Sequence, residues 1–432
     1  MPLNNLTVQQ QIIHSLSERL VEAQKPIRIL NALKWPAEVK SHFLKKKCRE
    51  LPLVTRDTYL NNPLNFDPDN KTDEFYAIER EIRRQLGQYS GVGNILLRMC
   101  REYREVIRLL QSRGTADFPK ISQELYGSAQ DAFYAGAPTL RDLATLVSST
   151  LKLAEIKPTD NLQDAKRYSA EESVHILSER LGLYFQDTDQ VRVKLRDDII
   201  ADASAGAESI KLRKDALFSE RDLRIFEVHE GWVHVGTTLN GLAQPICTFL
   251  SKGPPSSTLC QEGLAIILEI FTFSSYPERV LRLTNRVLAV DMVDQGADFL
   301  EVFNFYQELG WSKEESYKST VRAFRGCLPD LGPFTKDLSY SKGFILIYNY
   351  IRLAIKAGLQ HNIPLLFLGK TTLEDIPVLS ELVKEGIVIP PKYLPPQFKD
   401  LAALTAWMTY SLFLNQLNIE HLKLEYKGIL QK

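Results

Sequence analysis

The chain has 432 residues, 44% of them hydrophobic, which is enough to form the cores of two or three globular domains. Lys and Arg together number 53, as do Asp and Glu, so no overall charge attracts nucleic acid or an anionic membrane surface. Five scattered cysteines and a polar N-terminus without a signal-peptide pattern argue against a secreted disulfide-bonded domain and predict a cytoplasmic protein.

Residues 1–165 are predicted to form an N-terminal helical region. Apolar residues recur at helical spacing most clearly between Ile78 and Leu110. A loop is expected from Asn61 to Asp73, which contains two prolines among several Asn and Asp residues. The composition turns polar around residues 157–161, and we place a domain boundary there, followed by a second domain at residues 166–432.

The only convincing strands follow a helix that is expected from Ala170 to Leu183. Segments that alternate apolar and polar residues, or contain small residues, lie at 191–195, 199–204 and 208–213. They predict a small antiparallel sheet within a mainly α-helical chain, hence an α+β fold class. An edge strand there could hold an extended peptide by strand addition or simply end the sheet, and the sequence favours neither alternative.

The next predicted helix carries the residues most typical of chemistry, in the segment F-E-V-H-E-G-W-V-H at 226–234. His229 and His234 flank Glu230, and Glu262 begins a later apolar run. Catalytic zinc sites use three protein ligands and leave one position for water, so we predict that the two histidines and Glu262 bind Zn²⁺. Glu230 would then be the general base. The alternative is that both are ordinary histidines of a buried helix.

The spacing of the histidines predicts a distorted helix. They are five residues apart, whereas the common metallopeptidase motif H-E-x-x-H separates them by four. Five residues of regular α-helix rotate by about 500°, so the two rings would point roughly 140° apart. A π-bulge would realign them, and Gly231 lies where it would form. Glu227 on the same helix is a candidate to orient a ligand ring.

Two more segments complete the set of motifs: V-R-A-F-R-G at 321–326 and F-T-K-D-L-S-Y at 334–340. Arg322 and Arg325 are three residues apart, hence on one helix face, which by itself is typical of a solvated surface. Further on, the uncharged stretch Leu401–Ile419 contains several polar residues. We predict a buried helix there and no membrane span.

The motifs V-H-E-G-W-V-H, Q-E-G-L-A, V-R-A-F-R-G and F-T-K-D-L-S-Y resemble, in this order, those of the QEGLA-motif family. That family is similar to the microtubule-associated tyrosine carboxypeptidases, metallopeptidases with an H-E-x-x-x-H helix and an E-E-G-L-A glutamate. The resemblance covers roughly residues 170–390. The chain departs from the eukaryotic enzymes at Gln261, where they have Glu, and at Val228, where they have His.

The resemblance implies a gluzincin-like core and a zinc-dependent carboxypeptidase that acts on a peptide or protein C-terminus. It implies that Arg322, Arg325 or both bind the terminal carboxylate, because the guanidinium fork meets a carboxylate bidentately. Lys336 would add positive charge, and Tyr340 would donate its phenol to the oxyanion unless it is a core tyrosine. Specificity for an aromatic C-terminal residue such as tyrosine is implied by the resemblance alone.

Two functions of other classes remain open at this point. One is a non-enzymatic regulatory or scaffold protein that retains the fold, although such a protein has no need of the base Glu230. The other is a metal-dependent hydrolase of a small amide. We expect neither a nucleic-acid partner nor a membrane partner, and the sequence leaves the oligomeric state open.

Overall fold

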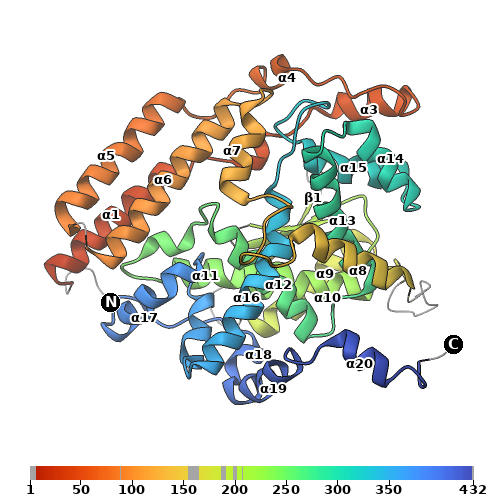
Figure 1. Ribbon diagram of the computed structural model, residues 1–432. Helices are drawn as coiled ribbons and strands as arrows, with labels where there is room; N and C mark the ends of the chain where they lie inside the picture. The colour runs from red at the N-terminus through yellow and green to blue at the C-terminus, as the bar shows by residue number, and fades with distance from the viewer. Residues whose placement is uncertain are drawn as a thin grey trace.

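The computed structural model describes residues 6–87, 89–153, 165–185, 191–197, 202–206 and 208–430. In these residues most of the chain is helical, and three short strands form one sheet (Figure 1). The predicted mainly helical class with a small sheet is confirmed. The predicted domain boundary lies at residues outside the described part, and the division into two domains stays a prediction.

Nine helices precede the sheet in the described part of the chain. They are α1 (Val8–Gln24), α2 (Ile29–Ala32), α3 (Ala37–Lys45), α4 (Arg56–Leu60), α5 (Pro68–Leu86), α6 (Gly91–Gln111), α7 (Asp117–Tyr126), α8 (Leu140–Leu153) and α9 (Ala170–Tyr184). The expected loop 61–73 is shorter than predicted, because Asp67 caps α5 and Pro68 occupies its first turn. The apolar rhythm that begins at Ile78 is divided between α5 and α6, which Gly87 separates with a positive φ of 75°.

The sheet contains β1 (Arg192–Arg196), β2 (Ala203–Ala205) and β3 (Ser209–Arg213) in the order β1-β3-β2. β2 and β3 are antiparallel, as predicted, but β1 and β3 are parallel, so the prediction is wrong for β1 and the sheet is mixed. β3 lies at the centre of the sheet, and its side chains Ile210 and Leu212 are completely buried. Strand alternation in the sequence identifies the strands but does not say which of them are neighbours.

The helices after the sheet surround a long central pair. They are α10 (Glu220–Ile225), the π-helix η2 (Phe226–Val235), α11 (Gly236–Leu242), η3 (Thr248–Ser251), α12 (Ser257–Phe271), α13 (Pro277–Asp294), α14 (Phe299–Glu308), α15 (Lys313–Phe324), η4 (Lys336–Leu338), α16 (Ser339–Lys356), η5 (Gln360–Phe367), η6 (Leu373–Asp375), α17 (Ile376–Lys384), α18 (Pro396–Lys399), α19 (Leu401–Leu414) and α20 (Ile419–Glu425). The central pair is α12 and α16, whose backbones touch where Gly263 faces Gly343.

The largest core cluster joins the N-terminal helices to those that follow the sheet. Leu16 of α1 and Leu96 of α6 belong to the same cluster of buried apolar residues as Leu264 of α12 and Ile347 of α16. The helices at the left of Figure 1 therefore pack directly against the part of the molecule that contains the histidine motif.

Helix α19 lies at the surface, so the prediction of a buried helix over 401–419 is wrong. Leu404 and Met408 face the body, whereas Tyr410 and Phe413 are 75% and 61% exposed. No helix in the described residues is long and apolar enough to cross a membrane. Beyond α19, α20 extends from the body towards the C-terminus (Figure 1).

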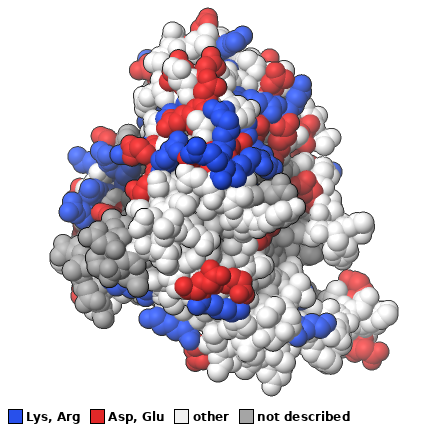
Figure 2. Space-filling view, turned by 90° about the vertical axis from the view of Figure 1, so that its left-hand side faces the viewer, with Lys and Arg blue, Asp and Glu red and all other residues white. Residues whose placement is uncertain are grey.

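Charges of both signs mix on the face shown in Figure 2. Lys and Arg gather in a band across its upper part, with Asp and Glu close by, and the area below is largely uncharged. This face therefore carries no continuous field of one sign, as the equal numbers of acids and bases lead us to expect.

Candidate metal centre

The histidine motif lies on a π-helix. η2 spans Phe226–Val235 and continues α10, which begins with a capping box of Ser219 and Asp222. The predicted i→i+5 distortion is confirmed, and it covers the whole motif instead of a single turn. Gly231 lies within it, and a Cβ at this position would collide with the Leu181 side chain of α9. Glycine therefore serves close helix packing as well as the distortion.

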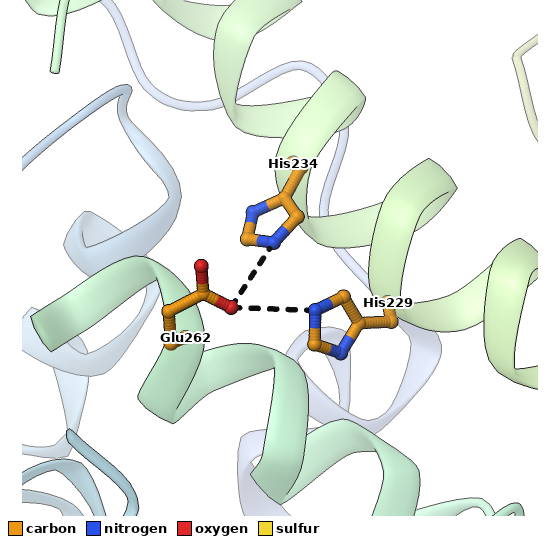
Figure 3. A group of neighbouring side chains, drawn as sticks. All are labelled: His229, His234 and Glu262. Atoms are coloured by element: carbon orange, nitrogen blue, oxygen red, sulfur yellow. Dashed lines mark ion pairs between the residues drawn. The ribbon is translucent and has the colours of Figure 1, made fainter. Parts of the chain in front are cut away.

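The widened turn directs both imidazole rings towards α12. Nε2 of His229 lies 3.4 Å and Nε2 of His234 lies 3.5 Å from Oε2 of Glu262 (Figure 3). The ligand atoms of the three residues lie within 4.8 Å of one another, and in the described part of the chain they are the only such group of His, Cys, Asp and Glu. The structure thus brings together the three residues that were predicted to bind zinc.

The electrostatics of this cluster fit a metal ion. Glu262 Oε2 is buried and has no hydrogen-bond partner among the described residues, although it lies between two ring nitrogens. Burial opposes its ionisation, but His234 and His229 hold the pKa of Glu262 well below its usual range. Burial also lowers the pKa of His229, but the neighbouring carboxylates of Glu262, Glu269 and Glu230 overcome this and raise it to about 9. Two imidazoles and one carboxylate are ligands that suit Zn²⁺.

The second ring nitrogen of His229 is held by a carboxylate that the sequence analysis did not identify. Nδ1 lies 2.7 Å from Oε1 of Glu269, and Arg279 donates to both oxygens of that carboxylate. Such outer partners fix the orientation and tautomer of a ligand histidine. The candidate Glu227 instead pairs with Arg224 at 2.9 Å. A signal for Glu269 did exist, because it is the single acid in an apolar run and lies seven residues, or two helical turns, after Glu262.

Glu230 lies beside the cluster and is held by the sheet. Its Oε2 accepts a hydrogen bond of 2.7 Å from the backbone N–H of Ala205 in β2. Strand β2 is an edge strand of the sheet and packs against η2. The strand therefore orients the predicted base and borders the same groove as the metal centre.

The predicted substrate-binding cations line the same groove. Arg322 is occupied by Asp337, with Nη2 and Oδ1 2.9 Å apart. Arg325 is 5% exposed, and its Nε has no hydrogen-bond partner among the described residues. Burial and the neighbouring Arg322 lower the pKa of Arg325 to about 10. Lys336 lines the same groove, and burial lowers its pKa.

Tyr340 lies between the metal centre and these cations. Its ring centroid is 6.2 Å from that of His229, and the guanidinium of Arg286 lies over the Tyr340 ring at 4.8 Å. Burial and the nearby Glu262 raise the pKa of Tyr340 to about 12, so its phenol keeps its proton at neutral pH. The phenol is thus a possible hydrogen-bond donor in the groove.

All eight residues predicted to form the site are close in space. Seven of them line a groove of about 730 Å³ together with Asp337 and Lys370, namely Glu230, His234, Glu262, Arg322, Arg325, Lys336 and Tyr340. The eighth, His229, is buried, and its Nε2 lies 3.4 Å from Oε2 of Glu262 in the groove lining. At its far end the groove runs past Gln24 and the segment 27–31 near α1 and α2.

A mainly helical fold with two histidines and a glutamate at the base of a groove is an arrangement typical of metallopeptidases. The family model of the microtubule-associated tyrosine carboxypeptidases matches residues 41–416, which is most of the chain. The chain therefore belongs to the microtubule-associated tyrosine carboxypeptidase family, a family of peptidases, and the resemblance noted in the sequence is confirmed. No curated protein sequence matches the chain.

Proposed function

We propose that this protein is a zinc-dependent carboxypeptidase with a gluzincin-like core that removes the C-terminal residue of a peptide or protein in the cytoplasm. The observation that carries the proposal is the unsatisfied Oε2 of Glu262 between the Nε2 atoms of His229 and His234. Three donor atoms converge there on the base of a groove, and the family match supports peptidase activity.

In this proposal His229, His234 and Glu262 hold the metal. When bound, Zn²⁺ lowers the pKa of a coordinated water and polarises the scissile carbonyl. Glu230 takes the proton of the water on its carboxylate and passes it to the leaving amine, while the Ala205 N–H keeps the carboxylate aimed into the groove.

The cations that line the groove give the reaction its preference for a chain end. Arg325 and Lys336 bind the terminal carboxylate, since Arg325 is buried and its Nε has no partner among the described residues. Arg322 supports them through Asp337, and Tyr340 donates its phenolic proton to the developing oxyanion. Preference for an aromatic residue such as tyrosine comes from the family description alone and belongs to the proposal.

Bound metal and peptide cleavage test the proposal together. The wild type and the variants His229→Ala, His234→Ala, Glu262→Ala and Glu230→Gln are analysed for zinc content and for hydrolysis of peptides with different C-terminal residues. The wild type is expected to hold about one zinc ion per chain, which the first three variants lose. Glu230→Gln is expected to keep the metal and lose activity by about 10²-fold or more.

A matched control is Glu227→Gln, which removes a neighbouring carboxylate that pairs with Arg224 away from the groove. It should keep both metal and activity. If the wild type binds no zinc even after reconstitution, the peptidase proposal fails and the scaffold alternative takes its place. If only small amides and no peptides are cleaved, the small-amide hydrolase takes its place.

A further inference from the structure

Behind His234 lies a polar network that the roles assigned above do not use. Nζ of Lys370, in the loop after η5, donates to Oε1 of Gln261 at 2.8 Å, to the carbonyl oxygen of His234 at 2.9 Å and to Oγ1 of Thr237 at 3.0 Å. Gln261 also lies 3.5 Å from His234, between its Oε1 and Nδ1 of the ring. One lysine therefore joins η2, α11 and α12 immediately behind a candidate metal ligand.

Lys370 decides which end of the Gln261 carboxamide faces His234. Nζ donates to three oxygens at once, those of Gln261, His234 and Thr237, so the carboxamide atom that meets it is the oxygen. Thr237 cannot make this choice, because a hydroxyl both donates and accepts. With the oxygen directed at Lys370, the Gln261 Nε2 group points to the carbonyl oxygen of Gly369, 3.4 Å away.

The orientation of Gln261 in turn sets the chemistry of the His234 ring. Because an acceptor faces Nδ1, the neutral ring is stabilised with its proton on that nitrogen. Nε2 then keeps its lone pair and points towards Glu262 and the metal centre. A rotated carboxamide would present N–H to Nδ1 and favour the opposite tautomer, which cannot bind a metal through Nε2.

His229 has a similar arrangement of a hydrogen-bond acceptor and a basic side chain at its Nδ1. Glu269 accepts from Nδ1 of His229, and the Arg279 guanidinium holds Glu269 in place. Each ring thus has an acceptor at Nδ1, and each acceptor has a cation behind it. The difference is that a carboxylate accepts at either oxygen, whereas the carboxamide of Gln261 accepts at one end only.

We propose that Lys370 is a positioning residue of the metal centre, which orients the Gln261 carboxamide and thereby commits Nε2 of His234 to the metal. The inference rests on the proposed function, since it assumes that His234 is a ligand. It assigns a role to the position at which the Q-E-G-L-A motif of this chain departs from E-E-G-L-A.

The zinc affinity of the full chain, measured by competition with a chelator, tests this role. By charge alone, replacing a lysine beside the site should strengthen the binding of a divalent cation. A positioning role predicts the opposite, and we expect Lys370→Met to weaken zinc binding about 10-fold or more, the usual effect of losing an outer partner. Lys252→Met, which removes another lysine of the same groove, is the matched control and should not weaken binding.

The same lysine substitution in a Gln261→Glu protein separates the effect of carboxamide orientation from the effect of lost packing. In Gln261→Glu both ends of the side chain accept, so Lys370→Met should change zinc affinity by less than about 3-fold when it is added to Gln261→Glu. An equal loss in both backgrounds, or no loss with Gln261 present, would overturn the inference and leave the proposed function intact. A wild type without any zinc affinity would overturn both.

If Lys370→Met does not fold, as judged by circular dichroism, Gln261→Leu replaces it. This variant removes the acceptor and leaves the lysine in place. The expected loss of zinc affinity is again about 10-fold or more. An unchanged affinity in Gln261→Leu would overturn the inference.

Discussion

At the scale of single residues, Arg325 is the groove cation that is best suited to bind a substrate carboxylate. It is almost completely buried, and its Nε has no hydrogen-bond partner in the described part of the chain. A charge-assisted bond to a substrate carboxylate stabilises a complex by about 1.5–3 kcal/mol. We therefore expect Arg325→Met to raise KM for a peptide substrate about 10- to 100-fold, with a smaller effect on kcat.

The same peptide with an amidated C-terminus is the control substrate, because it has no carboxylate to lose. The ratio of kcat/KM between the free and the amidated peptide should fall in Arg325→Met. It should not change in Arg108→Met, which replaces an exposed arginine that pairs with Glu105 on α6. A ratio that stays the same in Arg325→Met would show that another group binds the chain end.

Asp337 is a buried carboxylate next to Arg322, Arg286 and Arg325, and its charge stabilises theirs. Burial opposes its ionisation, but Arg322, Arg286 and Arg325 hold the pKa of Asp337 far below its usual range. Removing one partner of a buried ion pair costs about 3–5 kcal/mol, because the other charge stays buried without compensation. Asp337→Asn should lower the free energy of unfolding by about this amount at pH 7, as measured by urea titration.

The pH dependence of this difference follows from the depressed pKa. The folded-state pKa of Asp337 lies below its unfolded value of about 3.9, so its contribution is fully present above that value and is lost as pH falls further. The gap between wild type and Asp337→Asn should be constant from pH 7 to about pH 5 and should narrow below about pH 4. The exposed Asp330→Asn should differ from wild type by less than about 0.5 kcal/mol.

At the scale of elements, the Q-E-G-L-A motif can be explained position by position. Gln261 is held by Lys370, and Glu262 belongs to the candidate metal centre. A Cβ on Gly263 would collide with the backbone of Gly343, so glycine allows α12 and α16 to approach closely. Leu264 and Ala265 are completely buried. The motif thus combines one candidate metal ligand with the packing that places it.

The crossing of α12 and α16 makes a direct prediction about Gly343. A Cβ at this position would meet the carbonyl oxygen of Leu259, a backbone atom that cannot rotate away. Gly343→Ala should therefore destabilise the protein by about 1–3 kcal/mol or more, measured as the free energy of unfolding in urea. Gly182 in α9 is the matched control, because it is also helical but has no atom within 4 Å of its ideal Cβ.

Gly182→Ala should stabilise the protein by about 0.5–1 kcal/mol, since alanine restricts the unfolded chain and favours a helix. The two substitutions are chemically identical and are expected to have opposite signs. If both destabilise the protein equally, the close approach of α12 and α16 does not decide the effect.

Local signals in the sequence were sufficient for most elements. The i to i+5 spacing of His229 and His234 predicted the π-helix, because one metal ion requires both rings on the same side. Ser219 and Asp222 form a capping box at the start of α10, and their three-residue spacing is visible in the sequence. These features depend on residues a few positions apart, and the physics that fixes them is local.

The features that the sequence did not predict depend on contacts between distant segments. The parallel pairing of β1 with β3 and the exposure of Tyr410 and Phe413 on α19 both depend on how segments far apart in the chain pack together. Lys370 is a single lysine in a loop, and no spacing relates it to Gln261 across 109 residues of chain. Glu269 was not predicted either, although helical periodicity places it on the same face of α12 as Glu262.

At the scale of the whole molecule, the metal centre is connected to the N-terminal helices through a common core. Ser17 of α1 accepts from the backbone N–H of Phe249 at 2.7 Å, and Arg98 of α6 pairs with Asp375 near η6. Buried apolar residues of α1, α6 and α12 form one cluster. Segments that share a core generally unfold together, whichever part of the chain they come from.

This connection predicts one cooperative thermal transition that responds to zinc as a unit. Ligand at about 1,000 times its Kd adds about 4 kcal/mol of stability. With an unfolding entropy of about 2.1 cal/mol/K per residue, Tm should rise by about 4 °C. Differential scanning calorimetry of the full chain with and without Zn²⁺ measures this shift, and His234→Ala should show one transition that zinc does not move. Two transitions, of which zinc moves only one, would instead show that the N-terminal helices and the metal centre unfold as separate domains.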